Sequence, residues 1–177
     1  YLEDGKDPGS QANGNGFKMG GSDDKTLRHN FTLRNCLAFN NKAKGFDQNS
    51  NMGSMILYNC TGHGNLEANY RIKTELAAGK VLVVKNCAEL GDMAEIGVFG
   101  EQTKNSWLSP FVVTAGDFRS TDATGADGPR KADGSLPHIE YMHLAAGSDH
   151  IDAGVDVGLP FMGTAPDLRC LETGLTG

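Results

Sequence analysis

A chain of 177 residues is long enough for one sizeable hydrophobic core, and its net charge of -6 argues against a nucleic-acid-binding surface, which is usually basic. No run of 18 apolar residues is present that could cross a membrane, so no membrane partner is expected. The 24 glycines and the scarcity of long apolar runs favour an all-β protein rich in turns, folded as one domain and expected to be a monomer.

The first conspicuous segment, GNGFKMGG (14–21), places Lys18 between glycine-rich stretches. A dinucleotide fingerprint needs G-x-G-x-x-G at the start of a helix, and a P-loop needs its lysine directly after glycine and before Ser or Thr. Neither spacing occurs here, and the following stretch, 22–30, lacks a helical apolar period. Nucleotide binding is therefore not expected.

An Asn-Cys pair recurs along the chain, after segments that alternate between apolar and polar residues. The pairs are Asn35-Cys36, Asn59-Cys60 and Asn86-Cys87, offset by 24 and then 27 residues. This is not the spacing of a zinc site, whereas a period in this range is typical of a solenoid. Stacking of the coils predicts a ladder of asparagine amides and a column of small buried cysteines. Disulfides between neighbouring coils stay open as an alternative to free thiols for Cys36, Cys60 and Cys87.

A second landmark repeats with a similar offset: an aromatic residue follows a turn residue at Phe17, Phe46 and Tyr70. Stacked at the strand spacing of about 4.8 Å, these residues would form an aromatic column, so each coil contains at least two short strands. In the same register Lys18 aligns with Asp47 and Arg71. Arg71 could clamp a substrate carboxylate beside Asp47, or the two could form an ordinary surface ladder pair.

From about residue 100 the period fades. We expect residues 1–105 to form parallel β-helix coils that continue an upstream part, and residues 106–177 to form a last partial coil and a loop-rich flap of the same domain. In this second region Asp149, Asp152 and Asp156 are weak candidates for calcium, without the order of an EF-hand.

Other single residues carry weaker signals. Asn30 and Asn59 each begin a glycosylation sequon, but burial in the ladder would exclude Asn59. The histidines show no ligand spacing, so structural or solvated roles are expected for His29, His63, His138, His143 and His150. No role is assigned to Cys170.

Three segments within about residues 10–90 resemble the core of polysaccharide lyase family 9: NGNGFKMGG, LRNCLAFNNKAKGFDQNSN and LYNCTGHGN. The later segment LAAGSDHIDAGVDVGLPFMGTAPDL resembles the tail that often closes secreted bacterial β-helix lyases. The resemblance implies a right-handed parallel β-helix that cleaves polygalacturonate by β-elimination. It also implies a calcium ion held by aspartates on earlier coils, with Lys18 as the base. A secreted, cell-surface or periplasmic protein of bacterial type that binds an acidic polysaccharide is expected.

Two departures from the family pattern stand out. The aspartate cluster has no counterpart before Lys18, where only Glu3, Asp4 and Asp7 occur, so no metal ligand is assigned and the calcium ligands are expected upstream. The tail usually reads P-D-L-G before an aromatic residue and Glu, whereas this chain has Pro-Asp-Leu-Arg-Cys-Leu-Glu (166–172). This change leaves the packing of the tail open.

The chemistry explains why a lysine and a cation would be needed. Removal of the C5 proton of galacturonate places negative charge beside a carboxylate, and calcium bound to that carboxylate relieves this. The base must be neutral, whereas a free lysine has a pKa of about 10.4, so alkaline pH should favour the reaction. The alternative is a non-catalytic β-helix that binds or displays carbohydrate, as in adhesin or tailspike modules, because the fold alone does not determine activity.

Overall fold

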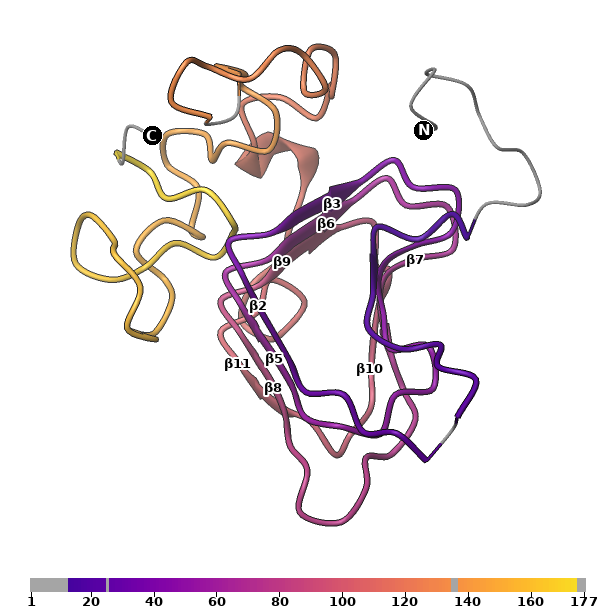
Figure 1. Ribbon diagram of the computed structural model, residues 1–177. Coiled ribbons are helices and arrows are strands. Elements are labelled where there is room, and N and C mark those ends of the chain that lie inside the picture. Colours follow the sequence, from indigo (N-terminus) through magenta and orange to yellow (C-terminus); the bar gives the residue numbers. More distant parts are fainter. Residues whose placement is uncertain (1–12, 25, 135–136, 175–177) are drawn as a thin grey trace.

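The computed structural model describes residues 13–24, 26–134 and 137–174. Its strands are short and run parallel in three sheets, called A, B and C here. The chain passes through A, then B, then C, and then returns to A for the next coil. In Figure 1, viewed along the stack, successive coils lie over one another around a common interior. The predicted parallel β-helix is therefore confirmed, with three strands in a full coil.

Each sheet takes one strand from each coil. Sheet A contains β1 (Phe17–Lys18), β4 (Lys44–Asp47), β7 (Ala68–Ile72) and β10 (Ala94–Ile96). Sheet B contains β2 (Phe31–Arg34), β5 (Met55–Tyr58), β8 (Leu82–Lys85) and β11 (Glu101–Thr103). Sheet C contains β3 (Leu37–Phe39), β6 (Thr61–His63) and β9 (Ala88–Leu90). A single turn of 3-10 helix, η2 (Ala115–Asp117), follows. In the described part of the chain no helix has the length and apolar character that a membrane crossing requires.

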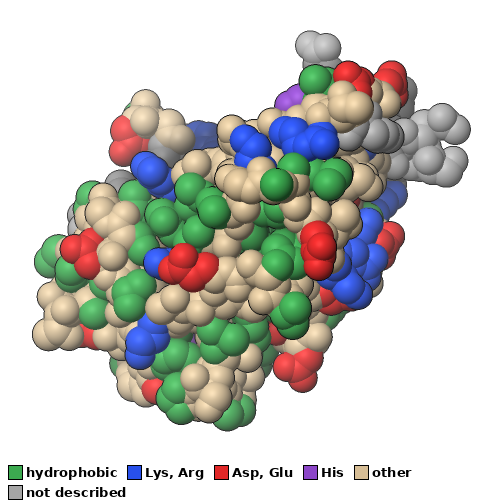
Figure 2. Space-filling view, turned by 90° about the horizontal axis from the view of Figure 1, so that it is seen from below, with side chains coloured by type: hydrophobic (Ala, Val, Ile, Leu, Met, Phe, Trp, Pro, Cys, Tyr) green, Lys and Arg blue, Asp and Glu red, His purple; other side chains and the backbone are tan. Residues whose placement is uncertain are grey.

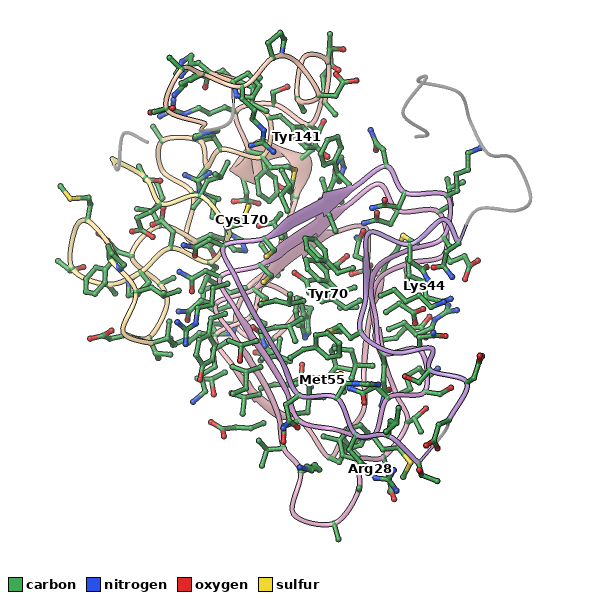
Figure 3. The ribbon with its side chains drawn as sticks, viewed as in Figure 1. Arg28, Lys44, Met55, Tyr70, Tyr141 and Cys170 are labelled. Carbon is green, nitrogen blue, oxygen red and sulfur yellow. The ribbon has the colours of Figure 1, made fainter. Side chains whose placement is uncertain are left out.

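Apolar side chains at alternate strand positions fill the interior. Figure 3 shows Met55 and Tyr70 inside the ring of coils. The predicted aromatic column is present: the rings of Phe17 and Phe46 stack at 5.0 Å, and those of Phe46 and Tyr70 at 4.7 Å. Trp107 packs on the far side of Tyr70 at 5.0 Å. The column runs along the stack and fixes the register of sheet A.

The Asn-Cys pairs form the corner between sheets B and C. Asn35, Asn59 and Asn86 all have left-handed backbones, with φ of 51°, 49° and 56°. The amide of Asn86 donates to the Asn59 Oδ1 at 3.1 Å, and Asn59 is buried, which agrees with the exclusion of its sequon. No amide bond joins Asn35 to Asn59 among the residues that the structure describes, so the observed ladder has one rung. The adjacent cysteines, and Cys170, are free thiols.

A second group of asparagines, not predicted, lies between sheets C and A. The Asn41 amide donates to Asn65 at 2.7 Å, and the Asn65 amide donates to Asn69 at 2.8 Å. Asn69 in turn donates to the buried carboxylate of Glu89 at 2.9 Å. These bonds satisfy polar groups at a buried corner that would otherwise cost stability.

The C-terminal region, drawn in orange and yellow in Figure 1, packs beside sheet C. Phe118, Tyr141 and Leu144 form its apolar cluster, which contacts Phe39 and Leu90 of sheet C. Figure 3 shows Tyr141 and Cys170 at this junction. The Cys170 backbone N–H donates to the Thr61 Oγ1 at 2.9 Å. This contact ties the region to the coils over a long separation in sequence.

Arg169 occupies the position where the family pattern has glycine. It is only 1% exposed, and its guanidinium donates to the Met142 carbonyl at 3.1 Å and to the Thr173 hydroxyl at 3.3 Å. Asp167 lies 3.7 Å away, also buried. The departure from the pattern therefore places a buried cation inside the C-terminal region, where it holds Met142 and Thr173.

Candidate active site on sheet A

Lys18 ends the outermost described strand of sheet A. Strand alternation directs Phe17 into the core and Lys18 outward, where its side chain is exposed. Among the described residues the Lys18 ammonium has no hydrogen bond or ion pair. Its described neighbours therefore leave the lysine open to a ligand that approaches the outer face of sheet A.

The register of sheet A brings the predicted site residues together. Lys18 pairs with Asp47, and Asp47 pairs with Arg71, as the sequence offsets predict. The next coil adds Glu95 opposite Arg71, which sequence reasoning missed. The result is a column of alternating charge along four strands.

Asp47 is held by protein groups. It is 6% exposed, and its carboxylate accepts hydrogen bonds from the Asn15 amide at 2.8 Å and from the Asn49 backbone at 3.2 Å. The Lys44 ammonium lies 3.8 Å from the same carboxylate. Figure 3 shows Lys44 beside the strands of sheet A. These contacts organise the turn beside Lys18 and leave little of Asp47 open to a ligand.

Arg71 is also occupied. Its Nε and one terminal nitrogen donate to the two oxygens of Glu95 at 3.1 and 3.0 Å, and Glu67 lies 3.4 Å from the other terminal nitrogen. The hydrogen bond to Glu95 raises the pKa of Arg71, and the bonds from Arg71 and Lys73 lower the pKa of Glu95. Arg71 could clamp a substrate carboxylate only by exchanging one of these partners.

Figure 2 shows the face seen from below, where basic and acidic side chains are interspersed with apolar ones. On sheet A this mixing follows from the ion pairs described above, which Lys73 extends through a contact of 3.2 Å with Glu95. A ligand on this surface would therefore meet paired charges, and Lys18 is the cation of the four-residue column that has no partner within 13–24, 26–134 and 137–174.

A cluster that could hold a metal ion lies away from sheet A, in the C-terminal region. It consists of Asp117, Asp149 and His150. The His150 Nδ1 lies 2.9 Å from Asp149 and 3.7 Å from Asp117, and the Asp117 carboxylate accepts hydrogen bonds from the Ser148 hydroxyl at 3.0 Å and the Thr114 backbone N–H at 2.8 Å. The other two candidate aspartates instead accept hydrogen bonds from the backbone of their own loops, Asp152 from Thr164 and Asp156 from Gly158. The three candidate aspartates do not form one site.

Calcium fits poorly beside Lys18 in the part of the chain that the structure describes. The carboxylate in register with Lys18 is that of Asp47, whose oxygens already accept protein hydrogen bonds. Glu3, Asp4 and Asp7 lie outside the described residues. The calcium ligands expected upstream remain a prediction.

The histidines have protein partners that suit structural roles. The ring nitrogen of His63 lies 2.7 Å from the Tyr141 hydroxyl at the junction with sheet C, and burial lowers the pKa of His63. The His29 ring nitrogen lies 2.6 Å from the Ser22 hydroxyl. His138 is largely exposed and lies 3.8 Å from Glu140.

Comparison with known proteins gives consistent matches. Residues 1–88 match the model of a family described as Pel9A-like, right handed beta helix region. A protein named pectate lyase L from Dickeya chrysanthemi is 34% identical over 161 residues, which cover 90% of this chain and 37% of that protein. Pectate lyase PEL9 from Emericella nidulans is 31% identical over 149 residues, 82% of this chain and 35% of that protein.

Solved structures agree with these matches. The crystal structure of pectate lyase Pel9A superposes with a TM-score of 0.83 at 33% identity, over 94% of this chain and 40% of that one. A rhamnogalacturonan lyase gives a TM-score of 0.52 at 25% identity over 65% of this chain and 30% of that one. The predicted right-handed β-helix is thereby confirmed. The chain spans a little over a third of the length of the curated relatives that it matches.

Proposed function

The chain belongs to the Pel9A-like family of right-handed β-helix proteins, polysaccharide lyase family 9, and we propose that it is part of a pectate lyase that cleaves polygalacturonate outside the cell. The names of its relatives support the class of substrate. The observation that carries the proposal is the position of Lys18, which is exposed on sheet A without a protein partner among the described residues, next to a carboxylate that is already bonded.

In the proposed reaction Lys18 is the base. Its neutral amine takes the C5 proton, the electrons of that C–H bond form the double bond between C4 and C5, and the bond from C4 to the glycosidic oxygen breaks. The departing oxygen takes a proton from solvent water. Calcium belongs to the proposal only through the family resemblance, because the described residues beside Lys18 do not form a calcium site.

The test uses the complete natural protein and polygalacturonate, with the absorbance of the unsaturated product as the readout. Lys18→Ala should lower kcat by about 100- to 10,000-fold while KM changes little, since general-base catalysis is typically of that size. Lys73→Ala, directly after β7 of the same sheet, is the matched control and should leave kcat near the wild-type value.

Lys18→Arg separates a base from an electrostatic anchor. Arginine keeps the positive charge and much of the reach, but with a pKa above about 12 it does not give up its proton at workable pH. If Lys18 is the base, Lys18→Arg should abolish turnover. If Lys18 only binds the substrate carboxylate, kcat should change little. Near-wild-type kcat for Lys18→Arg across neutral to alkaline pH would show that the proton is taken elsewhere.

A further inference from the structure

We propose that Gly21 and Asn49 position the amine of Lys18, so that the turns after β1 and β4 together form a slot for the end of the lysine side chain. This inference rests on the proposed function, which makes Lys18 the base. It assigns positioning roles to two residues that do not themselves transfer a proton.

The slot is defined by how closely the turn approaches the lysine. Gly21 has φ of +96°, and a methyl group on its Cα would lie 2.5 Å from the Asn49 Nδ2, 2.8 Å from the Lys18 Cε and 3.0 Å from the Lys18 Nζ. All three atoms belong to the ends of the Lys18 and Asn49 side chains, so a methyl group at position 21 would have to displace these two groups. The Lys18 head and the Asn49 amide therefore lie together against the Gly21 backbone.

The two walls of the slot are anchored. A methyl group on Gly20 would lie 2.5 Å from the Asn49 carbonyl oxygen and 2.7 Å from the Gln48 carbonyl oxygen, so the first coil packs backbone to backbone on the second. The Asn49 N–H donates to the buried Asp47, and the Met19 N–H donates to the Asp47 carbonyl at 2.8 Å. Asp47 thus stabilises the two turns that carry Asn49 and Met19, next to Lys18.

A fixed slot matters because a free lysine side chain samples many rotamers, and a proton transfer needs one geometry. A displacement of about 1 Å can cost about 100-fold in rate. If the amine is held beside Asn49, the lysine side chain samples fewer conformations, and a larger share of them can place the amine near the C5 proton.

The kinetic test compares two glycine variants of the complete protein. Gly21→Ala should lower kcat roughly 10- to 100-fold with little change in KM, because the methyl group displaces the Lys18 amine. Gly147→Ala is the matched control, since Gly147 has φ of +90° and no other atom within 4 Å of an added methyl group. It carries the same backbone strain and should keep kcat near the wild-type value. Equal losses in the two variants would overturn the proposal.

A second variant keeps the test valid if Gly21→Ala folds poorly. Asn49 has φ of 44°, which glycine adopts easily, and among the described residues its side chain makes no hydrogen bond. Asn49→Gly should widen the slot, and the double variant Gly21→Ala with Asn49→Gly should recover part of the kcat lost in Gly21→Ala. Additive losses would contradict a shared slot.

Positioning can also be measured without lyase activity. Acetylation of Lys18 by an amine-reactive ester, followed by mass spectrometry with Lys73 as internal reference, should be severalfold faster in Gly21→Ala and Asn49→Gly than in wild type. Gly147→Ala should be unchanged. Equal rates in all four proteins would overturn the slot. A wild-type protein that yields no unsaturated product would overturn the proposed function, while the acetylation rates would still decide the slot.

Discussion

At the scale of single residues, asparagine at the B–C corner combines a backbone and a side-chain role. The left-handed conformation of Asn59 and Asn86 is one that glycine also adopts, but only asparagine adds an amide that can bond to the next coil. In the last coil Lys104 takes the left-handed position, with φ of 53°, and Asn105 follows it. The Asn105 Oδ1 accepts from the Cys87 backbone N–H at 3.0 Å, which ends the ladder at that coil.

Asn59→Ala should destabilise the protein more than Asn49→Ala. Both positions have similar left-handed backbones, so the strain of alanine is shared. Only Asn59 is buried and accepts an amide bond, from Asn86. The expected difference in free energy of unfolding is about 1 to 3 kcal/mol, measured by chemical denaturation. Equal midpoints for the two variants would mean that the amide bond contributes nothing measurable.

The sequence predicted this corner because the Asn-Cys pair repeats as a dipeptide. It did not predict the cluster of Asn41, Asn65 and Asn69 with Glu89. Asn41 and Asn65 recur with the 24-residue offset of the Asn-Cys pairs, but the bonds from Asn65 to Asn69 and from Asn69 to Glu89 join positions that do not align in the repeat. A repeat in sequence shows which residues stack. It does not show which side chains turn sideways to bond within a corner.

At the scale of strands, the offsets between coils determined the register of sheet A. Because Phe17, Phe46 and Tyr70 must stack in the core, their outward neighbours are carried into a second column that contains Lys18. The offsets could not show that Glu67 and Glu95 neutralise Arg71, since ion pairs depend on side-chain rotamers. The position of each candidate residue was therefore predictable, while the substrate-binding roles of Asp47 and Arg71 stay predictions.

Phe46→Ala should be among the most damaging changes in sheet A. Its ring is fully buried and stacks on a neighbour on each side. We expect a loss of about 3 to 5 kcal/mol, as for other buried aromatic residues changed to alanine. Phe17→Ala, at the partly buried end of the same column, should cost clearly less. Thermal or chemical denaturation checks the order, and a larger loss for Phe17→Ala would contradict the described stacking.

At the scale of the whole molecule, the C-terminal region covers the outer face of sheet C. The amide of Asn86 donates to the Val155 carbonyl, and the Thr61 hydroxyl accepts from Cys170. The two contacts span 69 and 109 positions of the sequence. Because the C-terminal region has no repeat, no sequence pattern could predict where it contacts the coils. The sequence predicted a flap of the same domain but not the sheet on which it packs.

Acid should weaken this region through His143. Burial, with the positive charge of Arg169 as the next cause, lowers the pKa of His143 to about 4, against about 6.5 for an unfolded histidine. Between these values the unfolded chain binds more protons than the folded one, so the stability that neutral His143 contributes is present above about pH 6.5 and is lost as the pH falls toward 4.

The melting temperature should therefore fall between about pH 7 and pH 5, and His143→Gln should reduce that fall, because glutamine cannot take up the proton. His138→Gln, at an exposed histidine in the same region, is the control and should leave the dependence as in wild type. Hydrogen exchange at pH 5 should show that the faster-exchanging amides lie in 113–174 rather than in the strands of sheets A and B, because His143 and Arg169 both lie in the region that covers sheet C. If wild type and His143→Gln lose melting temperature in parallel, other titrating groups, such as His63 at the junction with sheet C, account for the acid sensitivity, and His143 does not couple protonation to the packing of this region.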